Sequence, residues 1–206
     1  IILRIRGIVL TVWCFRQPQY RSRVAHQTLL VLDFGSQYTQ LIARRLRELK
    51  VYAEIVPFEA SMDELRAQQP AGIILSGGPS TVRDDSAPRC DAGVFDLGIP
   101  VLGICYGMQL MVDMLGGKVE PAPEREFGHA TIEVESNCPL FTSLPDTVRV
   151  WASHGDLVAA APQGFRIVGA SANAPVAAME NQERQFYGLL FHPEVAHTQE
   201  GNIILS

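Results

Sequence analysis

The segment that decides the fold reads Pro100-Val101-Leu102-Gly103-Ile104-Cys105-Tyr106-Gly107. Its apolar first half is typical of a strand buried on both faces, and residues 108–115 continue it as a helix. Because Gly103 and Gly107 stand two positions before and after Cys105, the pattern predicts a sharp strand-to-helix turn with the cysteine at its apex. The N–H groups at the start of a helix favour a thiolate there. Cys105 is therefore a candidate nucleophile.

Other apolar runs predict a sheet of parallel strands around this turn. Strands are expected at residues 28–32, 51–56 and 72–76. Helices are expected between them, at residues 40–49 and at residues 61–65, where Ser61 is the predicted N-cap. Strands that alternate with helices in this way are typical of α/β folds.

The pattern changes after Gly116-Gly117, which is the predicted end of the central helix. Residues 120–123 are interpreted as a turn-rich connection, and the apolar runs that follow are short. Further strands are expected at residues 129–135, 149–151, 166–170, 176–179 and 186–191. The sequence therefore predicts an α/β fold with an open, mostly parallel sheet, flanking helices and an antiparallel extension.

A second polar motif, Phe191-His192-Pro193-Glu194, follows the last predicted strand. Because Pro193 forces His192 into an extended conformation, and residues i and i+2 of an extended chain share a face, His192 and Glu194 are expected to point the same way. The carboxyl ends of parallel strands meet at one edge of the sheet, so we expect this pair beside Cys105. A thiolate needs a base and a group that orients the base. The motif thus predicts a Cys-His-Glu triad.

The turn Gly77-Gly78-Pro79 follows another buried strand at the same edge. The backbone N–H groups of Gly78 and Tyr106 are predicted to form an oxyanion hole. The alternative base is His154, which lies in an expected polar loop at residues 151–156 and lacks a carboxylate placed as well as Glu194. The remaining histidines are interpreted as surface or structural residues: His26, His129 and His197.

The length of 206 residues and the ordinary composition favour one globular α/β domain. The net charge of −5 does not indicate a basic surface that would bind nucleic acid or an anionic membrane. The four cysteines form no CxxC pair, so neither a zinc site nor a disulfide framework is expected, and a reducing, cytoplasmic location is indicated. Three of these cysteines are interpreted as buried core residues: Cys14, Cys90 and Cys138.

Residues 1–26 are expected to lie outside the domain, which should span residues 27–206. The apolar stretch over residues 1–15 is too short and too interrupted by arginines to span a bilayer. A targeting segment is the alternative interpretation, but the small-residue cleavage site is missing. We therefore expect a disordered or mis-assigned leader, followed by a domain that is truncated at its C-terminal end.

The two motifs around Cys105 and His192 resemble those of the class I glutamine amidotransferases of the triad type, and they occur in that family's order. The resemblance begins near Leu29 and implies a flavodoxin-like fold. Within the family, the opening segment at residues 33–45 is similar to that of GMP synthases. Further segments share this similarity: residues 76–80, 125–128, 151–156 and 192–198.

The resemblance implies that Cys105 attacks the side-chain amide of glutamine while His192, oriented by Glu194, moves the proton. It also implies which residues contact the substrate: Gly77, Gln109, Ser153, His154, Gly155 and Asp156. No metal and no cofactor are expected in this domain. ATP and Mg²⁺ belong to the synthetase domain of such enzymes, whose Ser-Gly-Gly-x-Asp-Ser loop does not occur in this sequence.

The expected partners are glutamine and an ATP-pyrophosphatase synthetase domain, on the same chain or on a separate subunit, with a homodimer in the full-length protein. Nucleic acid and membranes are not expected partners. Three alternatives stay open at this point. The chain could be the amidotransferase subunit of anthranilate or aminodeoxychorismate synthase, a γ-glutamyl hydrolase or related cysteine peptidase, or a catalytically silent regulatory domain. We also expect the isolated chain to have low activity, because partners commonly organise such sites.

Overall fold

The structure, a computed structural model, describes residues 2–5, 8–11 and 27–206. Strands β1 (Ile2–Ile5) and β2 (Ile8–Thr11) pair with each other in antiparallel fashion. Much of the predicted leader, like Cys14 and His26, lies outside the described residues. The division into a leader and a domain starting at residue 27 therefore stays a prediction.

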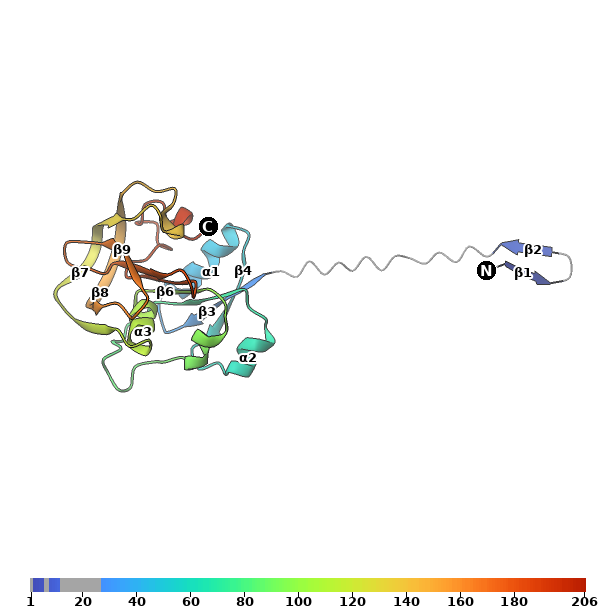
Figure 1. The fold of residues 1–206 in the computed structure, drawn as a ribbon, viewed down its shortest axis with the longest axis horizontal. Coiled ribbons are helices and arrows are strands. Elements are labelled where there is room, and N and C mark those ends of the chain that lie inside the picture. The colour runs from blue at the N-terminus through green and yellow to red at the C-terminus, as the bar shows by residue number, and fades with distance from the viewer. Residues whose placement is uncertain (1, 6–7, 12–26) are drawn as a thin grey trace.

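A nine-stranded sheet forms the centre of the domain (Figure 1), in the order β4-β3-β5-β6-β11-β10-β9-β7-β8. The first five strands in this order are parallel: β4 (Tyr52–Pro57), β3 (Thr28–Asp33), β5 (Gly72–Leu75), β6 (Val101–Ile104) and β11 (Phe186–Leu189). The other four strands extend the sheet, each pairing with its neighbour in antiparallel fashion: β10 (Ala178–Asn181), β9 (Arg166–Ala170), β7 (Lys118–Val134) and β8 (Thr147–Ala160). The predicted α/β fold is confirmed, and its antiparallel extension is larger than the sequence indicated.

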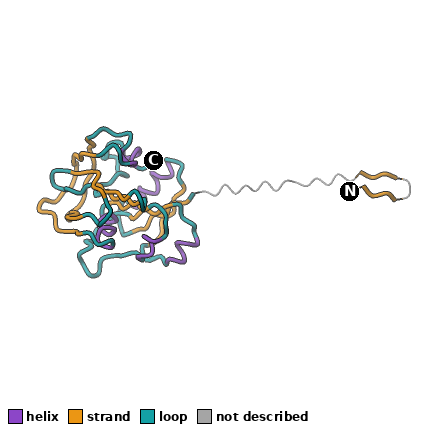
Figure 2. Tube along the Cα trace, viewed as in Figure 1, coloured by secondary structure: helices purple, strands orange, loops and turns teal. Residues whose placement is uncertain are grey.

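Helices cover both faces of the parallel strands (Figure 2). In β3, Val31 packs into one core layer with Ile42 and Leu46 of α1 (Thr39–Glu48). Its neighbours Leu30 and Leu32 pack into the other layer, which contains most of the buried side chains of α3 (Tyr106–Met114). This alternation explains why the strand reads as an unbroken apolar run.

The remaining helices are short: α2 (Met62–Ala67), α4 (Gly201–Ile204) and the 3₁₀ turns η1 (Ala92–Asp96) and η2 (Pro139–Phe141). The predicted capping at Ser61 is confirmed, since its side chain accepts from the Glu64 N–H while the Glu64 carboxylate accepts from the Ser61 N–H at 2.8 Å. Gly116 follows α3 with φ +84°, as its predicted capping role requires. Among the described residues, none of the helices has the length and apolar character needed to cross a membrane.

Two segments predicted as connections belong instead to long strands. Residues 120–123 lie in β7 and residues 151–156 lie in β8. A proline is tolerated in β7 because the pairing register shifts between Pro121 and Glu126. The inward face of β8 is polar at His154 and Asp156, since that part of the strand borders a cavity. Both predictions were wrong because polar residues and prolines in a strand read as loop.

The contact between α3 and β5 allows a direct test of the fold. A Cβ atom on Gly107 would lie 2.2 Å from the carbonyl oxygen of Leu75, so Gly107→Ala must push the helix away from the strand. We expect this variant to lose about 1–3 kcal/mol or more of unfolding free energy, measured by urea denaturation. Gly155→Ala is the matched control, because its Cβ would meet nothing closer than 3.6 Å. Equal midpoints for the two variants would contradict the proposed constraint.

Candidate active site

Cys105 lies at the apex of the turn between β6 and α3, as predicted. Its backbone adopts φ +52° and ψ −108°, a conformation that non-glycine residues rarely occupy. Two backbone hydrogen bonds hold it there: the Cys105 N–H donates to the Leu189 carbonyl at 2.7 Å, and the Gln109 N–H donates to the Cys105 carbonyl at 3.1 Å. The backbone strain therefore lies at Cys105 itself. The neighbouring glycines allow the strand and the helix to pack closely, since a Cβ on Gly103 would lie 2.7 Å from the Gly107 backbone.

His192 and Glu194 form a buried pair at the end of the strand beside Cys105. The Nδ1 atom of His192 lies 2.7 Å from Oε1 of Glu194, and the two residues are 3% and 0% exposed. His192 lines one cavity together with Cys105. The structure thus brings together the three residues that the sequence predicted as a triad.

Charge interactions set the protonation of His192. Burial of the ring lowers its pKa, but the sulfur of Cys105 and the carboxylate of Glu194 favour the imidazolium and raise the pKa to about 10. Among the described residues, Oε2 of Glu194 has no hydrogen-bond partner, so its charge is directed at the imidazole alone. The arrangement favours a protonated His192 beside the cysteine.

The His192 ring is held on several sides. The Tyr38 ring meets it edge-on, with centroids 5.1 Å apart. The backbone of His192 is also fixed: its backbone N–H donates to the Trp151 carbonyl at 2.9 Å, and the Thr198 hydroxyl donates to the backbone carbonyl of His192 at 2.5 Å. Gly77 leaves room for the ring, since a Cβ there would lie 3.1 Å from Cε1 of His192. The imidazole orientation is thus fixed by backbone and side-chain contacts from separate segments.

The predicted oxyanion-hole residues flank the cysteine. Gly78 lines both cavities that contain Cys105, and its backbone lies so close to Phe34 that a Cβ would come within 2.8 Å of the Phe34 carbonyl oxygen. The N–H of Tyr106 opens α3 and has no acceptor within the helix. Their joint role as an oxyanion hole stays a prediction.

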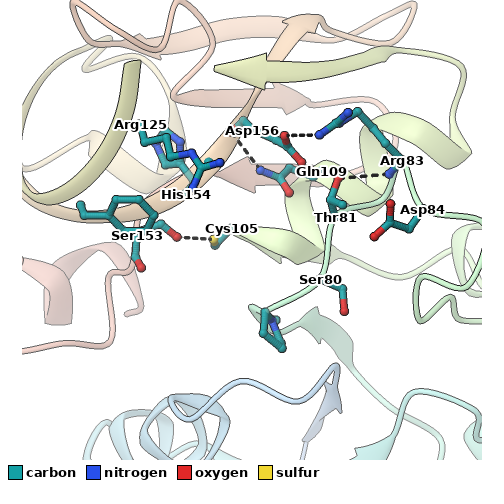
Figure 3. A pocket seen from close by; sticks show the side chains of 14 residues that line it. Ser80, Thr81, Arg83, Asp84, Cys105, Gln109, Arg125, Ser153, His154 and Asp156 are labelled. Carbon is teal, nitrogen blue, oxygen red and sulfur yellow. Dashed lines mark hydrogen bonds and ion pairs between the residues drawn. The ribbon is translucent and has the colours of Figure 1, made fainter. Parts of the chain in front are cut away.

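A cavity of about 440 Å³ extends from Cys105 toward β8 (Figure 3). The Cys105 thiol donates to the Ser153 carbonyl at 3.5 Å, and Nε2 of Gln109 donates to the Asp156 carbonyl at 3.1 Å. Gly155 completes this wall. Most of the residues predicted to contact the substrate therefore surround one space next to Cys105, while Gly77 lies beside His192.

His154, the alternative base, reaches this cavity but is paired elsewhere. Its Nε2 lies 3.1 Å from Oε2 of Glu126, whose other oxygen accepts from the Ser171 hydroxyl at 3.1 Å. Burial lowers the pKa of His154, and the Glu126 carboxylate opposes this only in part. His192 is thus the better placed base.

The other cysteines and histidines behave as the sequence indicated where they are described. Cys90 and Cys138 are free and buried, and burial raises their pKa values to about 11 and about 12. His129 and His197 are exposed and pack against Trp151, with centroid distances of 5.3 and 4.7 Å. Among the described residues, no group of three or more His, Cys, Asp or Glu side chains could hold a metal ion.

Several residues of the site escaped the sequence reading. Tyr38 follows β3, Arg83 follows β5, and Glu126 and Arg125 lie in β7. Both Tyr38 and Arg83 lie in loops that follow parallel strands, and such loops lie at the functional edge of the sheet. The β7 residues carried a different signal, the resemblance of residues 125–128 to GMP synthases, but it gave them no role at the site.

The comparison with family models agrees with this geometry. The model for class-I glutamine amidotransferases matches residues 30–206.

Curated relatives are similar over nearly the same region. A GMP synthase from Bacillus cytotoxicus is 52% identical over 180 residues, which are 87% of this chain and 35% of that protein. A GMP synthase from Campylobacter lari is 56% identical over 177 residues, 86% of this chain and 35% of that protein. The chain thus spans about a third of the length of these relatives.

Solved structures share the fold. A protein from Thermoplasma acidophilum, described as one subunit of a GMP synthase, superposes with a TM-score of 0.78 at 33% identity, covering 87% of this chain and 90% of that one. A glutamine amidotransferase from Thermotoga maritima gives a TM-score of 0.66 at 23% identity, covering 82% and 77%. With a family model matching most of its length and a Cys-His-Glu arrangement at the edge of the parallel sheet, the chain belongs to the class-I glutamine amidotransferases.

Proposed function

We propose that this chain is the glutamine-hydrolysing domain of a GMP synthase, with Cys105 as the nucleophile and His192 and Glu194 completing the triad. The observation that carries the proposal is the buried His192–Glu194 pair, 2.7 Å apart, beside a cysteine held at the apex of a strained turn. The relatives with which the chain shares about half of its residues are GMP synthases over this same region.

In the proposed reaction, the Cys105 thiolate attacks the side-chain carbonyl carbon of glutamine and forms a C–S bond. The oxygen then carries negative charge, which the N–H groups of Gly78 and Tyr106 stabilise. The His192 imidazolium donates its proton to the amide nitrogen, the C–N bond breaks, and ammonia leaves. A γ-glutamyl thioester remains on Cys105.

Water completes the cycle. Neutral His192 takes a proton from the water, whose oxygen attacks the thioester carbonyl carbon and forms a C–O bond. The C–S bond then breaks with the Cys105 thiolate as the leaving group, and the proton stays on the imidazole or passes to the sulfur. Glutamate leaves, and the enzyme is restored. Glu194 keeps the ring in one orientation and stabilises its positive charge, as the third member of a triad does.

The substrate is proposed to lie in the cavity between Cys105 and β8. The contacts that we assign to it come from one loop, one helix and one strand: Gly77, Gln109, Ser153, His154, Gly155 and Asp156. Glutamine thereby lies between the nucleophile and the polar inward face of β8. This domain is proposed to need neither a metal nor a cofactor.

The ammonia is proposed to pass to an ATP-pyrophosphatase synthetase domain, where ATP and Mg²⁺ activate XMP for amination to GMP. That domain is proposed as the partner of this one, in a cytoplasmic protein that is a homodimer at full length. The alternatives are weaker. Identities of 52% and 56% to GMP synthases disfavour an anthranilate or aminodeoxychorismate synthase subunit. The assembled triad disfavours a silent regulatory domain.

The first prediction concerns the nucleophile. Cys105→Ala should lower glutamate release from glutamine by about 10³-fold or more, because no other group can form the thioester. Cys90→Ala, which removes a buried thiol outside the site, is the matched control and should retain activity. Release should rise when a GMP synthetase domain, ATP, Mg²⁺ and XMP are added.

Three results would separate the alternatives. Release that needs Cys105 but ignores the synthetase domain and its substrates would move the partner to a sibling pathway. Equal release by the wild-type chain and by Cys105→Ala would contradict the assigned nucleophile. Absence of release under every condition would favour a silent domain.

The second prediction concerns pH. Because the pKa of His192 is raised to about 10, the imidazolium persists at neutral pH, and kcat/KM should fall only as the pH rises through that value. Glu194→Gln removes one cause of the raised pKa, so the fall should move toward the ordinary histidine value of about 6.5. Activity at pH 7 should drop roughly a hundredfold or more.

The measurement is kcat/KM for glutamate release between pH 6 and pH 11. Glu183→Gln is the control, because this exposed carboxylate lies in the turn between β10 and β11. If kcat/KM of Glu194→Gln falls at the same high pH as kcat/KM of the wild-type chain, the Glu194 carboxylate does not set the protonation of His192.

A further inference from the structure

Strand β7 is longer than the strand that covers one of its edges. β8 pairs with β7 along most of its length, from Lys118 to Glu133, whereas β9 pairs with it only at Glu133 and Val134. Over residues 125–131, the side of β7 that faces away from β8 therefore borders a cavity of about 380 Å³ instead of a strand. Residues 171–173 also line this cavity, which we call the edge slot.

The hydrogen bonds at the end of β7 show which backbone groups face the edge slot. The Val134 N–H donates to the Asp146 carbonyl at 2.8 Å, on the side of β8. The Glu135 N–H donates to the Val168 carbonyl at 3.0 Å, on the side of β9. Because the bonding direction alternates along an antiparallel strand, the odd-numbered residues of β7 bond away from β8.

The pairing of β8 gives the same result. The Trp151 N–H donates to the Thr198 hydroxyl at 3.0 Å, so Trp151 bonds away from β7. Its partner across the ladder is His129, which therefore belongs to a non-hydrogen-bonded pair. It follows that the backbone N–H and C=O groups of Phe127, His129 and Thr131 face the edge slot. Within residues 27–206, no strand pairs with them there.

The side chains beside the edge slot indicate what would pair with this edge. Phe127 is 67% exposed, and Arg125 is exposed without an ion-pair partner among the described residues. Both side chains share one face of the strand, because residues two apart point the same way. A complementary strand would therefore carry an apolar side chain and a carboxylate two positions apart.

We propose that the edge slot binds an extended segment of the synthetase partner, which adds to β7 as a further strand and places an apolar side chain beside Phe127 and a carboxylate beside Arg125. This inference rests on the proposed function, because the partner is the domain that receives the ammonia. The position favours that occupant. Arg125 and Phe127 border both the edge slot and the cavity that contains Cys105 (Figure 3), so a segment bound here lies next to the source of ammonia.

One side chain joins the edge slot to the cavity beside Cys105. Glu126 lines the edge slot, where its Oε1 accepts from the Ser171 hydroxyl at 3.1 Å, while its Oε2 lies 3.1 Å from Nε2 of His154. His154 in turn borders the cavity of Cys105. A strand that enters between β7 and residues 171–173 acts on the contact between Ser171 and Glu126. Docking should therefore change glutamate release as well as join the two domains.

The direct test is residue-resolved amide hydrogen exchange, measured by NMR for the chain alone and with the synthetase domain. In the chain alone, the amides of Phe127, His129 and Thr131 should exchange about tenfold or more faster than those of Ala130 and Ile132, which bond to β8. Addition of the synthetase domain should slow the three slot-facing amides by about tenfold or more. Unchanged exchange would overturn the inference. So would slowing that depends on the concentration of the chain alone, since a second copy would then occupy the edge.

A proline tests the backbone of the edge. Thr131→Pro removes one slot-facing N–H and leaves the bonds to β8 in place, because Thr131 bonds away from β8. Its affinity for the synthetase domain, measured by calorimetry, should fall about tenfold or more. Stimulation of glutamate release by that domain with ATP, Mg²⁺ and XMP should fall as well, while release by the chain alone stays unchanged. Thr131→Ala keeps the N–H and is the matched control, so equal affinities of the two variants would contradict the inference.

A charge reversal tests the same surface without altering the backbone, and it decides the matter if Thr131→Pro does not fold. Arg125→Glu should weaken binding of the synthetase domain about fivefold to tenfold at low salt and less at high salt. Arg66→Glu is the control, because Arg66 is an exposed residue of α2, which follows the strand at the other end of the sheet. Equal weakening by both reversals would overturn the inference.

The results for the edge slot are separable from those for the proposed function. Cys105-dependent glutamate release that rises with the synthetase domain, together with unchanged amide exchange at the edge slot, would overturn this inference and leave the proposed function standing. Absence of glutamate release and of synthetase binding under every condition would remove both.

Discussion

Helix α3 lies against strand β5 at a distance that only glycine permits, since a Cβ on Gly107 would lie 2.2 Å from the Leu75 carbonyl oxygen. This contact fixes where the helix begins and so fixes Cys105 at its first turn. The cysteine cannot relax from its positive φ, because its N–H is bound to Leu189 of β11 and its carbonyl to Gln109 of α3. Backbone strain of this kind persists where the surroundings over-determine it.

The same contact aligns the other parts of the site. Strands β5, β6 and β11 are neighbours in the parallel sheet, so their carboxyl ends deliver the Gly77-Gly78 turn, Cys105 and the segment of His192 to one edge. The antiparallel extension then closes this edge, because β8 bridges to the end of β11 through Ala152 and Phe191. The position of Cys105 relative to these elements therefore depends on how α3 packs against the sheet.

Sequence reasoning found the parts of the site that are local in the chain. The turn at Cys105 is encoded by residues within two positions, and His192 and Glu194 are likewise two residues apart. The antiparallel half was harder, since Pro121 lies within β7 only because the pairing register shifts there. The ion pair of Arg83 and Asp156, 3.0 Å apart in the cavity beside Cys105, joins positions 73 residues apart, and nothing in either local segment announces the other. Contacts of this kind depend on which strands become neighbours.

The two carboxylates at the site illustrate how burial divides their roles. Glu194 is fully buried and faces the imidazole alone, so its effect on His192 is present whether or not a substrate is bound. Asp156 borders the cavity and shares its charge with an arginine that is partly open to solvent, so its surroundings change when a charged ligand enters. The His192–Glu194 pair is therefore held by the fold itself, whereas the charge of Asp156 is shared with a side chain that is open to solvent. In the proposed reaction, the buried pair would supply the chemistry, and the more open cavity wall would contact the substrate.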